Sequence, residues 1–130
     1  MKQNETNLSF KQLMLRDELI NNLASLNYDQ MTPVQAQTLP SILSRKDIIT
    51  QAKTGSGKTA SFGLGILNQL KIDIYHVQAL ILCPTRELAE QVAQSLRRYA
   101  RLMPNVKVLN LSGGLPFKPQ QDSLRHSAIS

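Results

Sequence analysis

The sequence predicts an α/β fold in which a parallel sheet is flanked by helices. Short apolar runs, typical of buried strands, alternate with longer segments of helical periodicity. A glycine-rich loop lies between the first of these runs and a helical segment, in the order strand, loop, helix. At 130 residues the chain has the usual size of one domain, so we expect one domain or a part of one.

Composition narrows the class of protein further. Hydrophobic residues make up 42% and charged residues 18% of the chain, which excludes a disordered tail. No apolar run approaches the roughly 20 residues that span a bilayer. The single cysteine, Cys83, excludes an internal disulfide and is expected to be a small buried residue on a strand. A formal charge of +6 favours polyanionic partners, and we expect a soluble cytoplasmic protein.

The first elements of the chain are a leader and a helix. Residues 1–7 are polar, and helical spacing of apolar side chains predicts an amphipathic helix between Arg16 and Asn27. Asn27 suits a left-handed helix end. The apolar positions of this helix are Leu19, Ile20, Leu23 and Leu26.

A second helix is predicted to start at a capping box. Thr32 is the expected N-cap, Pro33 fits the first helical position, and Gln35 stands three residues after the cap. Pro40 is expected to break this helix in two, because proline removes an N–H donor from the helix interior.

The remaining elements repeat the order of strand and helix. Strands are predicted over 47–52, 77–84 and 106–111, with helices reaching Leu70 and running from Thr85 to Leu102. Ligands of such folds bind beyond the carboxyl ends of the strands. Each motif described below falls at one of these ends.

The glycine-rich loop has the spacing of a Walker A phosphate loop, with alanine in place of the first glycine. Its residues are Ala52, Lys53, Thr54, Gly55, Ser56, Gly57, Lys58 and Thr59. In such a loop the backbone N–H groups cradle phosphate, Lys58 reaches the β- and γ-phosphates, and the Thr59 hydroxyl binds Mg²⁺. The competing interpretation is a Gly-Ser loop with a solvated lysine.

Three ordered motifs together resemble those of DEAD-box ATP-dependent RNA helicases. They are Tyr28 to Gln35, Thr54 to Thr59, and Pro84 to Ala89. The segments between them are most similar to the bacterial DbpA-like branch. The resemblance implies a Q-motif region over 8–36 and a partial RecA-like, ATP-binding helicase domain over 37–130, with ATP and Mg²⁺ as cofactors.

The resemblance assigns nucleotide contacts to two residues outside the loop. It implies that Gln35 reads the adenine edge, for which an amide offers both a donor and an acceptor. It also implies that Phe10, seventeen residues before Asn27, packs on the adenine. The alternatives are that Gln35 only closes its own helix and that Phe10 is a core or lid residue.

The resemblance also implies RNA as a partner, with ribosomal RNA among the candidates. Pro84, Thr85 and Arg86 match the motif that holds the RNA backbone, where Arg86 forks to a phosphate. Gly113 and Gly114 match a glycine doublet at which bare backbone approaches RNA. The alternatives are a plain helix cap with a surface arginine, and an ordinary turn.

Several positions depart from the family pattern or receive no role. Asn27 and Arg45 replace common glycines and Gly65 replaces a common proline, for which we expect only local effects. An arginine cluster is interpreted as a solvated face, and the two histidines have no partners at catalytic or metal-ligand spacing. These residues are Arg97, Arg98 and Arg101, and His76 and His126.

The acidic metal-binding motif of the family is not in the sequence. The three predicted strands lead into Lys53, Thr85 and Ser112 instead of a carboxylate, and the chain ends before the Asp-Glu-Ala-Asp motif. The resemblance implies an RNA-dependent ATPase as the parent protein, whereas we expect these 130 residues alone not to hydrolyse ATP. The resemblance also implies that central strands of the sheet are absent, so we expect the isolated chain to be poorly folded or aggregation-prone.

Two rival functions remain open at this level. One is a truncated RNA-binding module without turnover, which the positive charge and Arg86 would serve. The other is an unrelated P-loop kinase or transporter ATPase, which would lack adenine specificity through Gln35.

Overall fold

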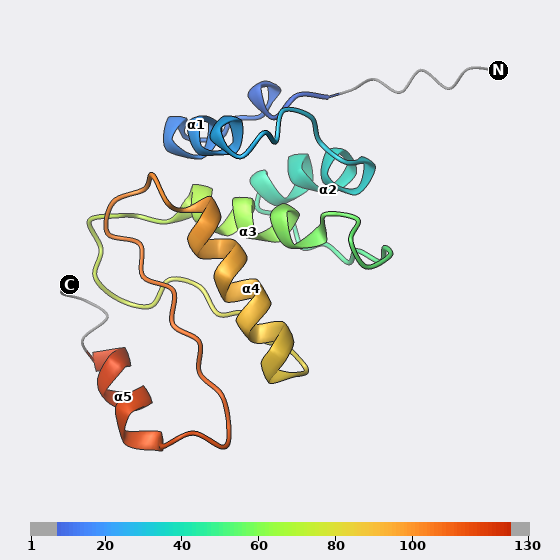
Figure 1. Cartoon of the computed structure of the whole chain (residues 1–130). Helices are drawn as coiled ribbons and strands as arrows, with labels where there is room; N and C mark the ends of the chain where they lie inside the picture. The colour runs from blue at the N-terminus through green and yellow to red at the C-terminus, as the bar shows by residue number, and fades with distance from the viewer. Residues whose placement is uncertain (1–7, 126–130) are drawn as a thin grey trace.

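The protein, represented by a computed structural model, has a helical layer from which two long non-helical segments extend (Figure 1). The structure describes residues 8–125, so the predicted leader 1–7 and His126 lie outside the described residues. The elements in chain order are the 3₁₀ helix η1 (Phe10–Gln12), α1 (Asp17–Ser25), α2 (Pro33–Leu43), α3 (Lys58–Gln69), α4 (Arg86–Tyr99) and α5 (Phe117–Arg125).

Helix α3 lies at the centre of the helical layer. It packs against α2 on one side and α4 on the other, and α1 also contacts α4. Leu19, Leu39 and Leu64, from α1, α2 and α3, are fully buried. Burial of such side chains contributes roughly 1.5 to 3 kcal/mol each, which makes this cluster the main core of the described chain.

Helix α1 begins and ends as its sequence predicts. Asp17 and Glu18 lie in its first turn, where carboxylates favour the positive end of the helix dipole. Asn27 has a φ of 60°, and the N–H of Tyr28 donates to the carbonyl of Leu23 at 2.9 Å. This arrangement is the left-handed helix end predicted for Asn27.

Arg45 occupies a second left-handed position, with a φ of 60°. The N–H of Lys46 donates to the carbonyl of Ser41 at 3.1 Å, which closes the end of α2 in the same way. This conformation costs a residue with a Cβ about 1 to 2 kcal/mol. That cost is a physical reason why glycine is common at this position in the resembled family.

The predicted break at Pro40 is wrong, because α2 continues through it to Leu43. Pro40 lies on the exposed side of the helix, so water can reach the carbonyl of Ala36 that loses its usual N–H partner. The neighbouring Leu39 is fully buried, and its packing offsets the cost of an interior proline, about 3 kcal/mol.

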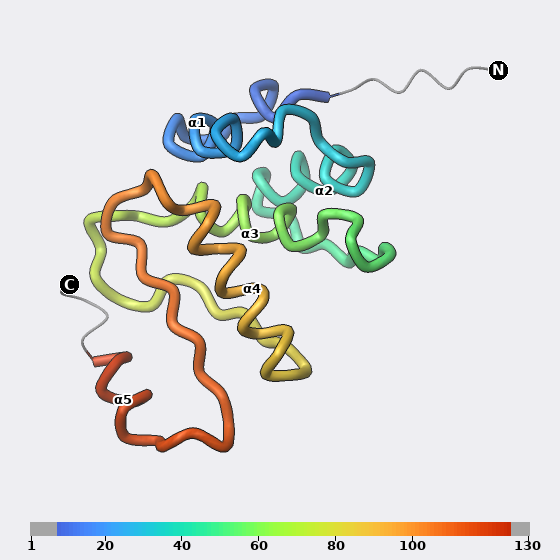
Figure 2. The backbone as a smooth tube through the Cα atoms, viewed as in Figure 1, coloured from blue at the N-terminus to red at the C-terminus, as the bar shows by residue number. Residues whose placement is uncertain are grey.

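The predicted strands 47–52, 77–84 and 106–111 are not strands in the described part of the chain. Between residues 8 and 125 the one β-type pairing is an isolated antiparallel bridge between Ser9 and Gln30. Figure 2 traces the last two segments as open chain between helices. A strand needs a neighbour for its N–H and C=O groups, and no backbone hydrogen bond joins these segments within residues 8–125.

The side chains of these segments have the exposure expected of an uncovered sheet. Ile49, Leu80 and Leu82 are 101%, 80% and 85% exposed. Cys83 is only partly buried, contrary to the prediction, because its segment packs against the core on one side and is uncovered on the other. The predicted open core therefore agrees with the structure, whereas poor folding or aggregation stays a prediction.

Asn22 fixes the end of α4 to α1. This side chain is fully buried, and its Nδ2 donates to the carbonyls of Arg98 at 2.6 Å and Tyr99 at 2.8 Å. Its Oδ1 accepts from Arg101 Nε at 3.4 Å, while the Ser25 hydroxyl donates to the backbone carbonyl of Asn22 at 2.7 Å. The amide thus satisfies carbonyls at a helix end that has no further helical partners.

We expect Asn22→Ala to lower the free energy of unfolding by about 2 to 3 kcal/mol, because it leaves two carbonyls without a partner at a largely buried helix end. Urea denaturation followed by helical circular dichroism measures the change. Asn21→Ala is the matched control, since Asn21 is exposed on the same helix and should change stability by less than about 0.5 kcal/mol. Equal effects of the two substitutions would contradict the role of Asn22.

Candidate functional site

The glycine-rich loop turns directly into the N-terminus of α3. Gly55 and Gly57 have φ values of 82° and 93°, a conformation that glycine adopts without steric cost. Gly57 is the N-cap of α3, so free N–H groups and the positive end of the helix dipole face the loop. This geometry suits an anion such as a phosphate group.

Two polar side chains of the loop are available for such a ligand. Lys58 donates a hydrogen bond from Nζ to the carbonyl of Ala52, which joins the two ends of the loop. The hydroxyl of Ser56 is buried and has no hydrogen-bond partner among the described residues. A Cβ added at Gly55 would meet no atom within 4 Å, so the loop is open on that side. The residues present therefore fit a phosphate ligand.

The capping box at the start of α2 is built as predicted. The Thr32 hydroxyl accepts from the N–H of Gln35 at 3.4 Å, and Gln35 Oε1 accepts from the N–H of Thr32 at 2.9 Å. The same two side chains also reach the loop. Thr32 Oγ1 donates to the carbonyl of Ser56 at 2.8 Å, and Gln35 Nε2 donates to the carbonyl of Gly57 at 3.2 Å.

The cap and loop contacts of Gln35 leave part of the hydrogen-bonding capacity of its amide unused. Its side-chain oxygen has two lone pairs and its NH₂ group has two hydrogens, and the contacts described above use one of each. The remaining lone pair and N–H form the donor and acceptor pair that complements the N6 and N7 edge of adenine. Gln35 is 6% exposed, so little of its amide is open to solvent.

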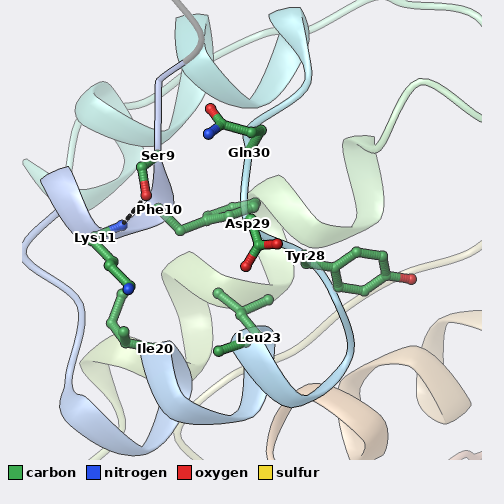
Figure 3. A pocket seen from close by; sticks show the side chains of 9 residues that line it. Ser9, Phe10, Lys11, Ile20, Leu23, Tyr28, Asp29 and Gln30 are labelled. Atoms are coloured by element: carbon green, nitrogen blue, oxygen red, sulfur yellow. Dashed lines mark hydrogen bonds between the residues drawn. The ribbon is translucent and has the colours of Figure 1, made fainter.

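Phe10 lines a pocket between η1 and the chain that follows α1, and Gln35 is not part of this pocket (Figure 3). This pocket has a volume of about 240 Å³, and its lining includes Tyr28, Asp29 and Gln30 but not Gln35. Phe10 is 4% exposed and belongs to the hydrophobic core. The structure does not bring Phe10 and Gln35 into one pocket, so an adenine contact of Phe10 stays a prediction.

A second group of predicted residues meets at the N-terminus of α4. Thr85 is the N-cap of this helix, and its hydroxyl accepts from the N–H of Leu88 at 3.1 Å. Gly114 has a φ of 80°, and a Cβ added there would lie 2.7 Å from Arg86 Nη1. The guanidinium of Arg86 thus rests against the bare backbone of Gly114. Residues 28 positions apart in the sequence form one surface.

The arginines of α4 make intramolecular contacts. Arg97 Nη2 donates to the carbonyl of Val108 at 3.0 Å, and the guanidinium of Arg98 lies 5.8 Å from the ring centre of Tyr99. Asn110 donates to Glu90 at 2.7 Å, and this hydrogen bond is the main cause that lowers the pKa of the Glu90 carboxyl. Burial raises the pKa of Tyr99. The Arg97 and Glu90 contacts tie α4 to the segment that follows it, and Arg97, Arg98 and Arg101 are all exposed, as predicted for a solvated face.

Sequence reasoning missed two features of these sites. It treated Thr32 as a cap alone, although its hydroxyl also holds the loop. It did not predict α5, whose Gln120 binds the segment around Gly113 and Gly114. The capping-box pattern was an available signal for Thr32, whereas the nine residues of α5 offer only Phe117 and Leu124 as large apolar positions, too few to establish a helical period.

Residues 8–125 hold neither a candidate metal-ligand cluster nor a candidate membrane-spanning helix. No group of three or more His, Cys, Asp or Glu side chains in this part of the chain is placed to hold a metal ion. None of its helices is long and apolar enough to cross a membrane.

The sequence of this chain is similar to those of known helicases. Residues 32–130 match the family model for DEAD/DEAH box helicases. Over 108 residues the chain is 60% identical to ATP-dependent RNA helicase DbpA from Escherichia coli (strain K12), which covers 83% of this chain and 24% of that protein. The chain therefore spans about a quarter of the length of this curated relative.

Solved structures give a similar result. A DEAD box protein from the hyperthermophile Methanococcus jannaschii matches with a TM-score of 0.78 and 34% identity, covering 89% of this chain and 32% of that chain. Dbp5 from S. cerevisiae bound to RNA and ADP BeF3 matches with a TM-score of 0.70 and 30% identity, covering 73% and 25%. These likenesses confirm the predicted α/β fold class.

Proposed function

Because this chain belongs to the DEAD/DEAH box helicase family, we propose that it supplies the ATP-binding half-site and part of the RNA-backbone site of an ATP-dependent RNA helicase. The observation that carries the proposal is the pair of hydrogen bonds from Thr32 and Gln35 to the loop carbonyls of Ser56 and Gly57. They join the residue suited to reading a base directly to the loop suited to holding phosphates. A site that recognises a whole nucleotide needs both parts.

Each residue of the nucleotide site has a separate task in this proposal. The loop N–H groups and the Ser56 hydroxyl bind phosphate oxygens, and Lys58 exchanges its bond with Ala52 for one with the β- and γ-phosphates. Thr59 would hold Mg²⁺, which neutralises phosphate charge when bound. Gln35 selects adenine through its remaining donor and acceptor.

We also propose that these 130 residues bind ATP without hydrolysing it. Hydrolysis needs a carboxylate that positions the metal-bound water at the end of a strand. The three strand-like segments of this chain lead into Lys53, Thr85 and Ser112, none of which is acidic. In this proposal the adenine is read by residues 8–36, and the phosphates and RNA are bound by residues 37–130. The larger helicase would act on RNA in the cytoplasm.

The RNA contact is assigned to the surface that Arg86 forms with Gly113 and Gly114. The guanidinium is exposed and can form two parallel bonds with a phosphate, and the glycines allow a close approach of the sugar–phosphate chain. Such contacts position RNA without reading its sequence.

The proposal predicts that the chain prefers ATP to GTP and that Gln35→Glu removes this preference. Glutamate keeps the acceptor for the N–H of Thr32 but lacks the donor that reads adenine N7, so ATP affinity should fall by about tenfold. Isothermal titration with ATP and GTP measures both affinities. Gln37→Ala is the matched control, because Gln37 is exposed on the same helix and should leave both affinities unchanged.

Equal affinity of the unmodified chain for ATP and GTP would overturn adenine selection and favour a different class of P-loop protein.

A second candidate function is an RNA-binding module without nucleotide dependence, which the contact between Arg86 and Gly114 favours. Salt-dependent RNA binding that ATP does not change would support that candidate.

A further inference from the structure

The side-chain amide of Gln120 holds the loop that carries the glycine doublet. Its Oε1 accepts from the N–H of Ser112 at 2.9 Å, and its Nε2 donates to the carbonyl of the same residue at 3.2 Å. The two Nε2 hydrogens are shared with the carbonyls of Pro116 at 3.1 Å and Leu115 at 3.4 Å. Gln120 therefore binds the chain on both sides of Gly113 and Gly114.

This arrangement replaces a strand partner at the end of 106–111. The amide of Gln120 presents one acceptor and one donor to the N–H and C=O of Ser112, as the peptide group of a neighbouring strand would do. Side chains in the loop give little other anchorage, because Leu115 is 59% exposed. The Gln120 side chain therefore gives α5 a direct hold on the conformation of this loop.

The conformation of this loop in turn determines whether the Gly114 backbone contacts the Arg86 guanidinium. Gly114 has a left-handed φ of 80°, and the space where a Cβ would stand is taken by the guanidinium, with Nη1 at 2.7 Å and Cζ and Nη2 at 3.0 Å. A small movement of the loop would separate the cation from the bare backbone. Holding both in place before RNA arrives reduces the ordering cost of binding.

We propose that Gln120 is a positioning residue of the RNA-backbone site: it fixes Gly113 and Gly114 under Arg86 so that the guanidinium and the glycine backbone meet the same phosphate. The inference rests on the proposed function, in which Arg86 and the doublet bind RNA. Gln120 does not itself touch RNA in this view. Removing its amide should weaken RNA binding and leave nucleotide binding unchanged, because Gln120 makes none of its hydrogen bonds with the loop from Ala52 to Thr59.

The experiment compares Gln120→Ala, Gln120→Glu and Arg86→Ala in this chain. A fluorescent single-stranded oligouridine reports RNA affinity by anisotropy, and isothermal titration reports ATP affinity. Gln121→Ala is the matched control, because this neighbouring glutamine of α5 makes no side-chain hydrogen bond in the described structure. Amide hydrogen exchange at Ser112 checks whether the loop has been released.

We expect Gln120→Ala to weaken oligouridine binding about five- to tenfold, to speed exchange at Ser112, and to leave ATP affinity unchanged. Gln120→Glu keeps the acceptor and loses the donor, so its RNA affinity should lie between those of Gln120→Ala and the unmodified chain. Because Arg86 and Gln120 act through one contact, the double variant should bind RNA about as weakly as Arg86→Ala alone.

The outcomes separate the inference from the function on which it rests. If Arg86→Ala weakens RNA binding and Gln120→Ala does not, the positioning role is overturned and the RNA site stands. If neither substitution changes RNA affinity, both the RNA site and the role of Gln120 are overturned. Equal losses of RNA and ATP affinity in Gln120→Ala would show a general loss of folding and would also overturn the proposed role.

Discussion

Lys58→Ala is expected to weaken ATP binding by about a hundredfold, because a hydrogen bond between an ammonium and phosphate oxygens contributes roughly 1.5 to 3 kcal/mol. In the described structure the Lys58 side chain makes one hydrogen bond, to the carbonyl of Ala52 at the other end of the loop. Fold stability should change little, with a melting temperature within about 2 °C of the unmodified chain. Isothermal titration and thermal denaturation measure the two effects.

The control for this prediction is Lys46→Ala. Lys46 is exposed and lies outside the glycine-rich loop, so its removal lowers the net charge equally and should change ATP affinity by less than about twofold. A similar loss of affinity in both variants would mean that general charge, and not Lys58, attracts the nucleotide. The assignment of the phosphate site would then be wrong.

Gly57→Ala is expected to disrupt both the fold of the loop and its ligand binding. The left-handed φ of 93° costs an alanine about 1 to 2 kcal/mol. The new Cβ would also lie 2.5 Å from Gln35 Nε2 and 3.0 Å from Thr32 Oγ1, and such overpacking costs about 1 to 3 kcal/mol. We expect a total loss of about 3 kcal/mol in unfolding free energy and ATP affinity reduced by more than about tenfold. Urea denaturation and isothermal titration measure these losses.

Gly55→Ala provides a closely matched comparison. Gly55 has a similar φ of 82°, but a Cβ added there would meet no atom within 4 Å. Both substitutions carry the backbone cost, and only Gly57→Ala displaces the side chains of Thr32 and Gln35. If the two variants lose equal stability, the contact between the start of α2 and the loop contributes nothing measurable.

The sequence predicts best the features that depend on a few neighbouring residues. The capping box of Thr32 and Gln35, the left-handed end at Asn27 and the N-cap at Thr85 are all confirmed. Each results from hydrogen bonds between residues close in sequence, so local chemistry decides it. The resemblance to DEAD-box helicases and to the DbpA-like branch is confirmed for a similar reason, since its motifs are short and ordered.

Features that depend on distant residues were predicted less well. The segments 77–84 and 106–111 have strand-like sequences, but a strand also needs a hydrogen-bonding neighbour. The helix continues through Pro40 because of burial around Leu39, which cannot be seen in the local sequence. The contact of Gln120 with Ser112 could not be predicted, because it depends on where α5 lies.

The roles of individual site residues stay predictions. The structure places Gln35 on the glycine-rich loop and Arg86 on Gly114, which the sequence alone did not establish. It places Phe10 in the core beside another pocket, so its part in adenine binding has less support than that of Gln35. The titrations proposed above decide between these assignments.

The packing of α2 on α3 has a consequence for how the sequence can evolve. A Cβ at Gly65 would lie 2.1 Å from Cγ2 of Ile42, so α3 approaches α2 this closely only because position 65 has no side chain. A mutation that adds a side chain there would require Ile42 to shift or to be replaced by a smaller residue. We therefore expect the residues at positions 42 and 65 to be correlated in size between lineages.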